Sequence, residues 1–132
     1  MLSIFFAAGA LKRLDLGGGA PQTLAPVTVG WGGTWNAEGV IVFAPSLGSG
    51  LQRVSAAGGA VTAVTTLGPQ QSAHYLPFFL PDGRRFLFTA AGAPEAQGVY
   101  LSALDGSTPT RLAPDNSQAG YLPADQIGRA HV

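Results

Sequence analysis

Apolar residues along this chain fall in short runs that are separated by turn-forming residues. The run at 40–43 reads VIVF and is continuously apolar and rich in β-branched residues, which is typical of a strand buried on both faces. No window places apolar residues at the i, i+3, i+4 and i+7 spacing of an amphipathic helix between capping residues. The pattern therefore predicts an all-β protein made of short strands.

One fifteen-residue pattern occurs three times. Residues 11–25 (LKRLDLGGGAPQTLA), 51–65 (LQRVSAAGGAVTAVT) and 99–113 (VYLSALDGSTPTRLA) align without a gap, at offsets of 40 and then 48 residues. Each copy predicts a β-hairpin, because its centre holds the Gly-Gly or Asp-Gly pair that tight turns with positive φ require. The predicted turn residues are Gly18-Gly19, Gly58-Gly59 and Asp105-Gly106.

A second motif lies between these copies. Residues 34–43 (TWNAEGVIVF) and 78–88 (FFLPDGRRFLF) each place an aromatic residue, Trp35 or Phe79, four positions before a glycine, and an apolar run follows. Both motifs predict a strand, a tight turn and a buried strand. The predicted turns are Glu38-Gly39 and Pro81-Asp82-Gly83.

Together the two motifs give four short strands in each repeat. Four strands in about 40 to 50 residues is the period of a propeller blade. The sequence therefore predicts antiparallel four-stranded blades of an incomplete β-propeller. The expected units are a partial first blade (1–32), a second (33–67), a third (68–114), the start of a fourth (115–125) and a non-native tail (126–132).

The first unit is expected to begin in the middle of a blade. Ile4-Phe5-Phe6 is interpreted as taking the place of Phe86-Leu87-Phe88. Because a propeller protects its sheet edges and faces by closing a ring, an open set of blades is expected to self-associate. The apolar faces expected to mediate this contain Ile41, Phe43, Phe86 and Phe88.

The C-terminal residues break the repeat. Residues 127–132 read IGRAHV, which resembles the in-frame translation of a short-read sequencing adapter, and Gln126 fits the same reading frame. The segment is therefore predicted to be non-native, the alternative being a native polar tail, and Arg129 and His131 are left out of any candidate site.

Charge and composition narrow the function. The net charge is zero, charged residues are only 11% of the chain, and no basic stripe is present, so nucleic-acid binding is not expected. The absence of cysteine excludes a disulfide scaffold and cysteine-ligated zinc. The apolar run 1–11 is followed, not preceded, by Lys12 and Arg13 and is too short to span a bilayer, which favours a buried strand over a targeting or membrane segment.

The repeat motifs resemble a known family. FFLPDGRRFLF is similar to the TolB-type propeller repeat, in which an aromatic residue precedes Ser-Pro-Asp-Gly and an apolar strand; here Leu80 replaces the serine. TWNAEGVIVF departs further, because Ala37 and Glu38 replace Pro-Asp. Residues 32–45 and 74–88 also resemble propellers fused to bacterial serine/threonine kinase domains.

The resemblance implies a non-catalytic binding or sensing module from a larger bacterial protein, such as a kinase-linked receptor. Its partner would be a protein or peptide, and its location periplasmic or extracytoplasmic. The alternative is the non-catalytic gating propeller of a serine peptidase. Kinase HRD and DFG motifs beside the propeller would favour the first, and a GxSxG motif the second; neither occurs here.

Few residues offer chemistry. A Ser72, His74 and Asp82 triad is conceivable, but proximity in sequence does not define one, and His74 is interpreted as a loop or blade-contact residue. The three glycines at 17–19 lack the GxxxxGK[ST] pattern of a phosphate loop. The chain is therefore predicted to have no catalytic site.

Metal and ligand candidates are also weak. Asp82, Asp105 and Asp115 are too far apart in sequence to form a hard-cation site, so no metal or cofactor is expected. Trp35 aligns with Phe79, which predicts a repeated core position. Trp31 has no such counterpart and is the weak candidate for a binding aromatic.

Overall fold

The protein is built from β-strands. The computed structural model describes residues 2–15, 17, 19–27, 30, 32–46 and 48–114. Within these residues there are eleven strands and no helix, and every strand pairing is antiparallel. The all-β prediction is therefore confirmed.

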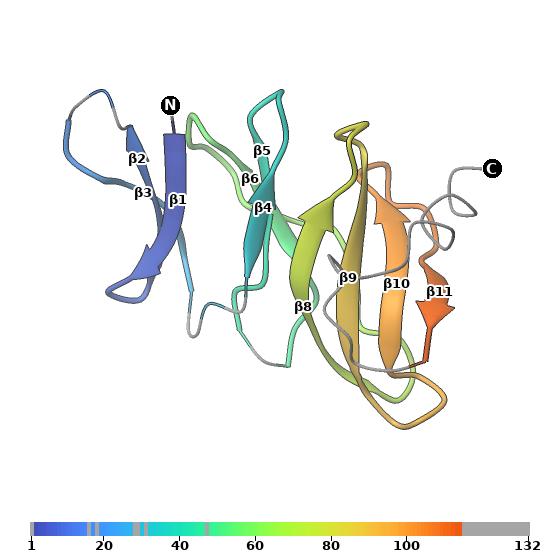
Figure 1. The fold of residues 1–132 in the computed structure, drawn as a ribbon. Coiled ribbons are helices and arrows are strands. Elements are labelled where there is room, and N and C mark those ends of the chain that lie inside the picture. The colour runs from blue at the N-terminus through green and yellow to red at the C-terminus, as the bar shows by residue number, and fades with distance from the viewer. Residues whose placement is uncertain are drawn as a thin grey trace.

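The strands form three separate sheets that follow one another along the chain (Figure 1). The first sheet contains β1 (Leu2–Ala7), β2 (Ala10–Asp15) and β3 (Gln22–Pro26). The second contains β4 (Gly33–Trp35), β5 (Val40–Phe43), β6 (Gln52–Ser55) and β7 (Thr62–Ala63). The third contains β8 (Gln71–Phe79), β9 (Arg85–Gly92), β10 (Gly98–Ala103) and β11 (Thr110–Ala113).

The repeat seen in the sequence corresponds to repeated strand pairs. Its three copies form β2–β3, β6–β7 and β10–β11, and the motifs at 34–43 and 78–88 form the hairpins β4–β5 and β8–β9. Within each four-stranded sheet the strands are adjacent in chain order. The predicted antiparallel four-stranded sheets are thus present in the second and third units, and the first sheet has three strands.

The sheets pack face to face, and the core lies between them. One cluster joins the first and second sheets through residues such as Leu11 and Phe43, and another joins the second and third through residues such as Val42 and Phe88. Along β5, successive side chains point to opposite faces, so Ile41 and Phe43 contact the first sheet while Val42 contacts the third. This explains why the VIVF run is apolar at every position.

The same repeat positions recur in each hydrophobic cluster. Three aliphatic residues lie on one side of each sheet, the side that in the first and second sheets contacts the next sheet along the chain. We call this side the aliphatic face. The residues are Ile4, Leu11 and Leu24 in the first sheet, Val42, Leu51 and Val64 in the second, and Leu87, Val99 and Leu112 in the third.

The opposite side of the second and third sheets carries phenylalanine. Phe43 and Phe88 are each fully buried against the aliphatic face of the preceding sheet. Phe88 also stacks on Tyr100, with ring centroids 5.6 Å apart, and lies 6.1 Å from Phe86. We call this side the aromatic face.

The predicted alignment of β1 is wrong by one residue. Phe5 pairs with Lys12 and Phe88 pairs with Tyr100, and Lys12 and Tyr100 occupy the same repeat position. Phe5, not Phe6, therefore corresponds to Phe88. Since strand side chains alternate between faces, a slip of one residue reverses the face of each side chain. The apolar run at 4–6 did not by itself define which strand position each residue takes.

The residues that were expected on open sheet faces, where they would mediate self-association, are buried inside the chain. Ile41, Phe43, Phe86 and Phe88 are fully buried between sheets of the same chain, so none of them is on an open face. The sequence showed that these residues belong to sheet faces, but the packing of neighbouring sheets decided which faces are covered. The predicted fourth unit (115–125) and tail (126–132) lie outside the described residues.

Candidate functional site

A groove lies where two hairpin turns come together at one end of the sheets. The β4–β5 and β8–β9 turns lie at the same end of their sheets (Figure 1). They enclose a groove of about 390 Å³, lined by Thr34 to Glu38 from one hairpin and Phe78 to Gly83 from the other. All five predicted turns were expected only to reverse the chain. The structure brings residues of two of them, Glu38-Gly39 and Pro81-Asp82-Gly83, together at this groove.

Local hydrogen bonds shape both turns. In the first turn, the N–H of Gly39 donates to the carbonyl oxygen of Asn36 at 3.1 Å, and Gly39 has a φ of 81°. In the second, the N–H of Gly83 donates to the carbonyl oxygen of Leu80 at 2.9 Å, with a φ of 69° at Gly83. Glycine is favoured at both positions because a side chain is strained at positive φ.

Asn36 fixes the two turns relative to each other. Its Nδ2 donates to the carbonyl oxygen of Gly83 at 2.7 Å, across the groove. Its Oδ1 accepts from the backbone N–H groups of Glu38 at 3.1 Å and Val40 at 2.9 Å. A second link joins the hairpins, because the N–H of Phe79 donates to Thr34 Oγ1 at 3.2 Å. The groove is thus a preformed feature of two adjacent sheets.

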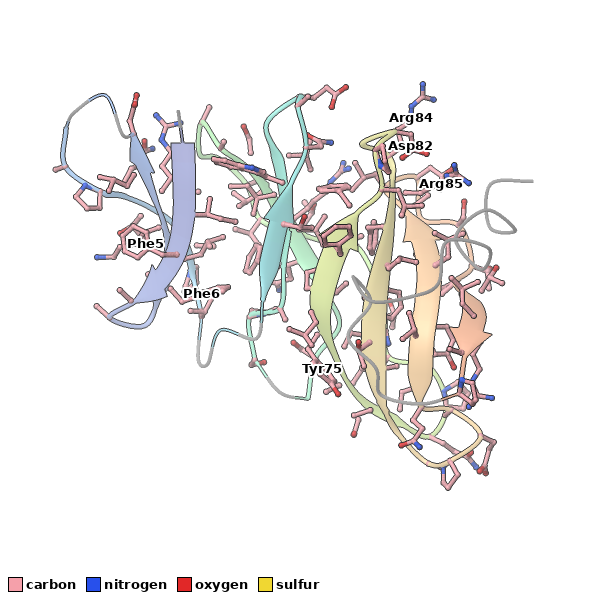
Figure 2. The ribbon with its side chains drawn as sticks, viewed as in Figure 1. Phe5, Phe6, Tyr75, Asp82, Arg84 and Arg85 are labelled. Atoms are coloured by element: carbon pink, nitrogen blue, oxygen red, sulfur yellow. The ribbon has the colours of Figure 1, made fainter. Side chains whose placement is uncertain are left out.

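Asp82 is held by its own turn. Its Oδ1 accepts from the N–H groups of Arg84 and Arg85, each at 2.9 Å, and its Oδ2 forms an ion pair with Arg85 Nε at 2.7 Å (Figure 2). Desolvation raises the pKa of the Asp82 carboxyl, but the hydrogen bonds from Arg85 and Arg84 outweigh it and lower the pKa to about 2. Asp82 therefore stays ionised and internally paired.

Three further side chains line the groove without taking part in these hydrogen bonds. Phe78 is 50% exposed, the one large hydrophobic side chain that is exposed in the described part of the chain. Trp35 is half-buried, and it packs against the core between the first two sheets. The carboxylate of Glu38 is exposed and has no hydrogen-bond or ion-pair partner among the described residues. Aromatic rings and an unpaired negative charge thus line the same groove.

Phe78 is exposed because β8 is irregular. The pairing of β8 with β9 shifts between Tyr75 and Phe78, and Leu76 within this bulge has a φ of 51°. A bulge displaces the alternation of side chains and re-aims those that follow it. The Leu76-Pro77 dipeptide was a signal in the sequence for such an irregularity, since proline cannot donate to the strand ladder.

The remaining predicted turns lie outside the groove. Gly58 and Gly59 have φ values of 92° and 115°, and the N–H of Gly58 donates to the carbonyl oxygen of Ser55 at 2.9 Å. Gly106 has a φ of 83°, and Asp105 accepts from the side chain and backbone N–H of Ser107, which lower the pKa of its carboxyl. Gly19 has a φ of 96°. Gly58 and Asp105 are thus held by local hydrogen bonds, and Gly18 lies outside the described residues.

Trp31, the predicted binding aromatic, lies outside the described residues. Trp35 and Phe79 both pack into clusters between sheets, as their alignment in the repeat predicts. Trp35 in addition lines the groove, which sequence reasoning missed because it assigned that residue to the core alone.

His74 belongs to a buried polar network, not to the imagined triad. Its Nδ1 lies 2.7 Å from Thr65 Oγ1 and its Nε2 lies 2.7 Å from Gln71 Oε1, whereas neither Ser72 nor Asp82 contacts it. Thr65 Oγ1 also accepts from the N–H of Leu51 at 2.8 Å. The network links the end of the second sheet to the start of the third.

These partners determine which ring nitrogen of His74 carries the proton, and burial lowers the pKa of the ring. Gln71 Oε1 can only accept, so Nε2 carries the proton, and the Thr65 hydroxyl donates to Nδ1 of the neutral ring. The ring is almost fully buried and packs against Phe88, with centroids 4.5 Å apart. Desolvation by burial lowers the pKa of His74 from 6.5 to about 4.

The hydroxyl and imidazole superficially resemble a nucleophile and its base, but their surroundings favour a structural role. Thr65 and His74 are both buried, and neither residue lines the groove. Both ring nitrogens already have partners within the network. A substrate would have no path to these atoms.

Two further searches covered the described residues. No helix there is long and apolar enough to cross a membrane. No group of three or more histidine, aspartate or glutamate side chains is placed to hold a metal ion in the same part of the chain.

The fold defines this chain as a protein of face-packed antiparallel β-sheets. Comparison with known proteins finds no matching family model and no matching curated protein. The resemblance to TolB-type repeats therefore remains a prediction.

Proposed function

We propose that this chain is a non-catalytic binding or sensing module built from β-propeller blades, and that it belongs to a larger bacterial protein such as a kinase-linked receptor. The proposal of a propeller is supported by three successive sheets that repeat both their strand order and their interface positions. The proposal of binding rests on the groove between the β4–β5 and β8–β9 turns.

The chemistry of the groove favours a peptide that carries a basic side chain. Aromatic rings attract guanidinium and ammonium groups, and a carboxylate strengthens that attraction. Phe78 and Trp35 supply the rings. Glu38 supplies a free carboxylate, whereas the carboxylate of Asp82 is already paired with Arg85. A volume of about 390 Å³ is within the range of small-ligand sites and suits one extended side chain.

Titration with blocked pentapeptides tests this proposal. The probes are four peptides that differ only at the central residue, which is Arg, Lys, Leu or Glu. With the arginine peptide we expect chemical-shift changes in ¹H–¹⁵N spectra at the amides of Asn36, Phe78 and Gly83. A dissociation constant of about 1 mM is expected, which corresponds to about 4 kcal/mol of binding free energy. The glutamate peptide should cause no such changes.

Amino-acid substitutions test which groove residues bind the arginine peptide. Glu38→Gln and Phe78→Ala should each weaken arginine-peptide binding at least about fivefold, which corresponds to about 1 kcal/mol. Glu95→Gln is the matched control, because Glu95 is an exposed carboxylate on the β9–β10 loop and does not line the groove. Equal responses to all four peptides, or equal effects of Glu38→Gln and Glu95→Gln, would contradict the proposal.

The purified chain is expected to show no hydrolase activity. The buried Thr65–His74 pair is not accessible to a substrate, so hydrolysis of p-nitrophenyl acetate should not exceed the rate with a denatured sample. The comparison is with Thr65→Val, which removes the hydroxyl. Turnover by the native chain that is lost in Thr65→Val would show that the pair is catalytic after all.

A further inference from the structure

The outer side of the first sheet is the third copy of the aromatic face. Phe5 pairs with Lys12 at the position where Phe43 pairs with Gln52 and Phe88 pairs with Tyr100. In Figure 2, Phe5 points away from the second sheet and Phe6 points toward it. The repeat thus places Phe5 on the side by which the second and third sheets contact their predecessors.

The copies differ in what covers them. Phe43 and Phe88 are fully buried, each against the aliphatic face of the sheet before it. Phe5 remains partly exposed, and so does Leu14, whose equivalent Val54 is buried. An apolar face that is covered twice within the molecule is therefore left uncovered on the first sheet.

The adjoining edge is open as well. β5 and β9 are flanked by β4 and β8, whereas β1 pairs only with β2 among the described strands. The side of β1 that corresponds to those flanking strands therefore presents unpaired backbone N–H and C=O groups. An unpaired edge and an uncovered face lie next to each other on the same sheet.

We propose that the aromatic face of the first sheet, with Phe5 and Leu14, docks the aliphatic face of a further sheet of the same repeat, supplied by the same parent polypeptide. This inference rests on the proposed propeller function. A second copy of the chain is the poorer occupant, because one residue of each of its aliphatic faces, Leu11, Leu51 or Leu87, is already fully buried within the chain. The occupant must present aliphatic residues at the positions of Val42, Leu51 and Val64, since these cover Phe88 within the chain.

The test uses an extended chain in which a copy of residues 33–83 precedes residue 1. The register makes this junction specific: Leu2 pairs with Asp15 as Arg85 pairs with Ala103, and Asp15 and Ala103 share a repeat position. Residue 1 thus takes the place of Arg84, directly after Gly83. The copy supplies an aliphatic face for Phe5 and a β8 equivalent for the edge of β1.

Phe5→Ala is then compared in the two chains. In the present chain it should lower the melting temperature by less than about 3 °C, and in the extended chain by about 10 °C, because only there is the ring buried. Phe78→Ala, at the exposed groove residue, should have a small effect in both. Amides of β1 should exchange with solvent at least about tenfold more slowly in the extended chain.

Several outcomes would overturn the proposal. One is an equally small effect of Phe5→Ala in both chains; another is an extended chain that melts lower or is less soluble than the present one. Aspartate at Val42 and Val64 of the added copy alone should abolish the gain, and a gain that survives this change would also contradict the docking. None of these measurements depends on peptide binding, so a failure of the groove proposal would be seen separately.

Discussion

Phe43→Ala is expected to lower the free energy of unfolding by about 3–5 kcal/mol. Phe43 is fully buried between the first and second sheets, where it packs against Leu11 and its neighbours. Truncation removes the favourable burial of the ring and leaves a cavity that the flanking sheets cannot fill by small shifts. Domains of this size are stable by only about 5–15 kcal/mol, so one substitution should remove a large part of the total.

Urea unfolding followed by tryptophan fluorescence measures this loss. The matched control is Phe78→Ala, the same chemical change at an exposed position, which should cost less than about 1 kcal/mol. Phe88→Ala, at the equivalent position of the next interface, should behave like Phe43→Ala. Similar small effects at Phe43 and Phe78 would mean that the first two sheets do not pack as described.

Acidification from pH 6.5 to about 4 is expected to remove up to about 3 kcal/mol of stability through His74 alone. The folded state holds His74 neutral, with a pKa of about 4, whereas the unfolded chain protonates it near its ordinary pKa of 6.5. Because the unfolded state binds more protons in this window, the contribution is fully present above pH 6.5 and is lost as the pH falls toward 4. Each unit of pKa corresponds to about 1.4 kcal/mol.

The physical cause is the burial of the ring, which would keep a charged imidazolium away from water. Protonation of Nδ1 would turn it from an acceptor into a donor, and the Thr65 hydroxyl that faces it would have to give up the hydrogen bond that it donates to the ring. No charged side chain contacts the ring in the described part of the chain; its contacts are Thr65, Gln71 and Phe88. A charge there would lack both water and a counter-ion.

The measurement is the difference in unfolding free energy between native protein and His74→Gln at several pH values from 7 to 4. This difference cancels the shared contribution of carboxylates such as Asp82. It should shrink as the pH falls, and His131→Gln, at the chain's other histidine, should show no such trend. A difference that is constant with pH would show that His74 does not remain neutral in the folded state.

Both predictions concern the contacts between neighbouring sheets. Phe43 holds the first pair of sheets together, and His74 with Phe88 holds the second pair. The groove is built across that second interface, because the Asn36 hydrogen bond to Gly83 joins a turn from each sheet.

The sequence alone determined the strands, the turns and the repeat. Short apolar runs and the glycine-containing turns between them are local signals, so the hairpins around Gly39, Gly58, Gly83 and Gly106 could be predicted from neighbouring residues. The repeat added long-range information, because equal patterns imply equal strand pairs. This was enough for an all-β fold of antiparallel sheets.

Only the tertiary structure decided which faces meet. Pairing between β1 and β2 fixes the register, and this places Phe5 outward and Phe6 inward. The apolar run at 4–6 is by itself compatible with either of the two orientations. The convergence of Glu38, Phe78 and Trp35 in one groove depends on the packing of two sheets and on a bulge in β8. Neither can be read from spacing.

The His74 network shows what signal was present but insufficient. Thr65 stands at a repeat position that alanine occupies in the other copies, as Ala25 and Ala113, and this departure marked the position as special. It did not identify the partner, because Thr65 and His74 meet through the packing of one sheet on the next. Local patterns determine strands and turns; contacts between sheets depend on register and burial, which involve residues far apart in the chain.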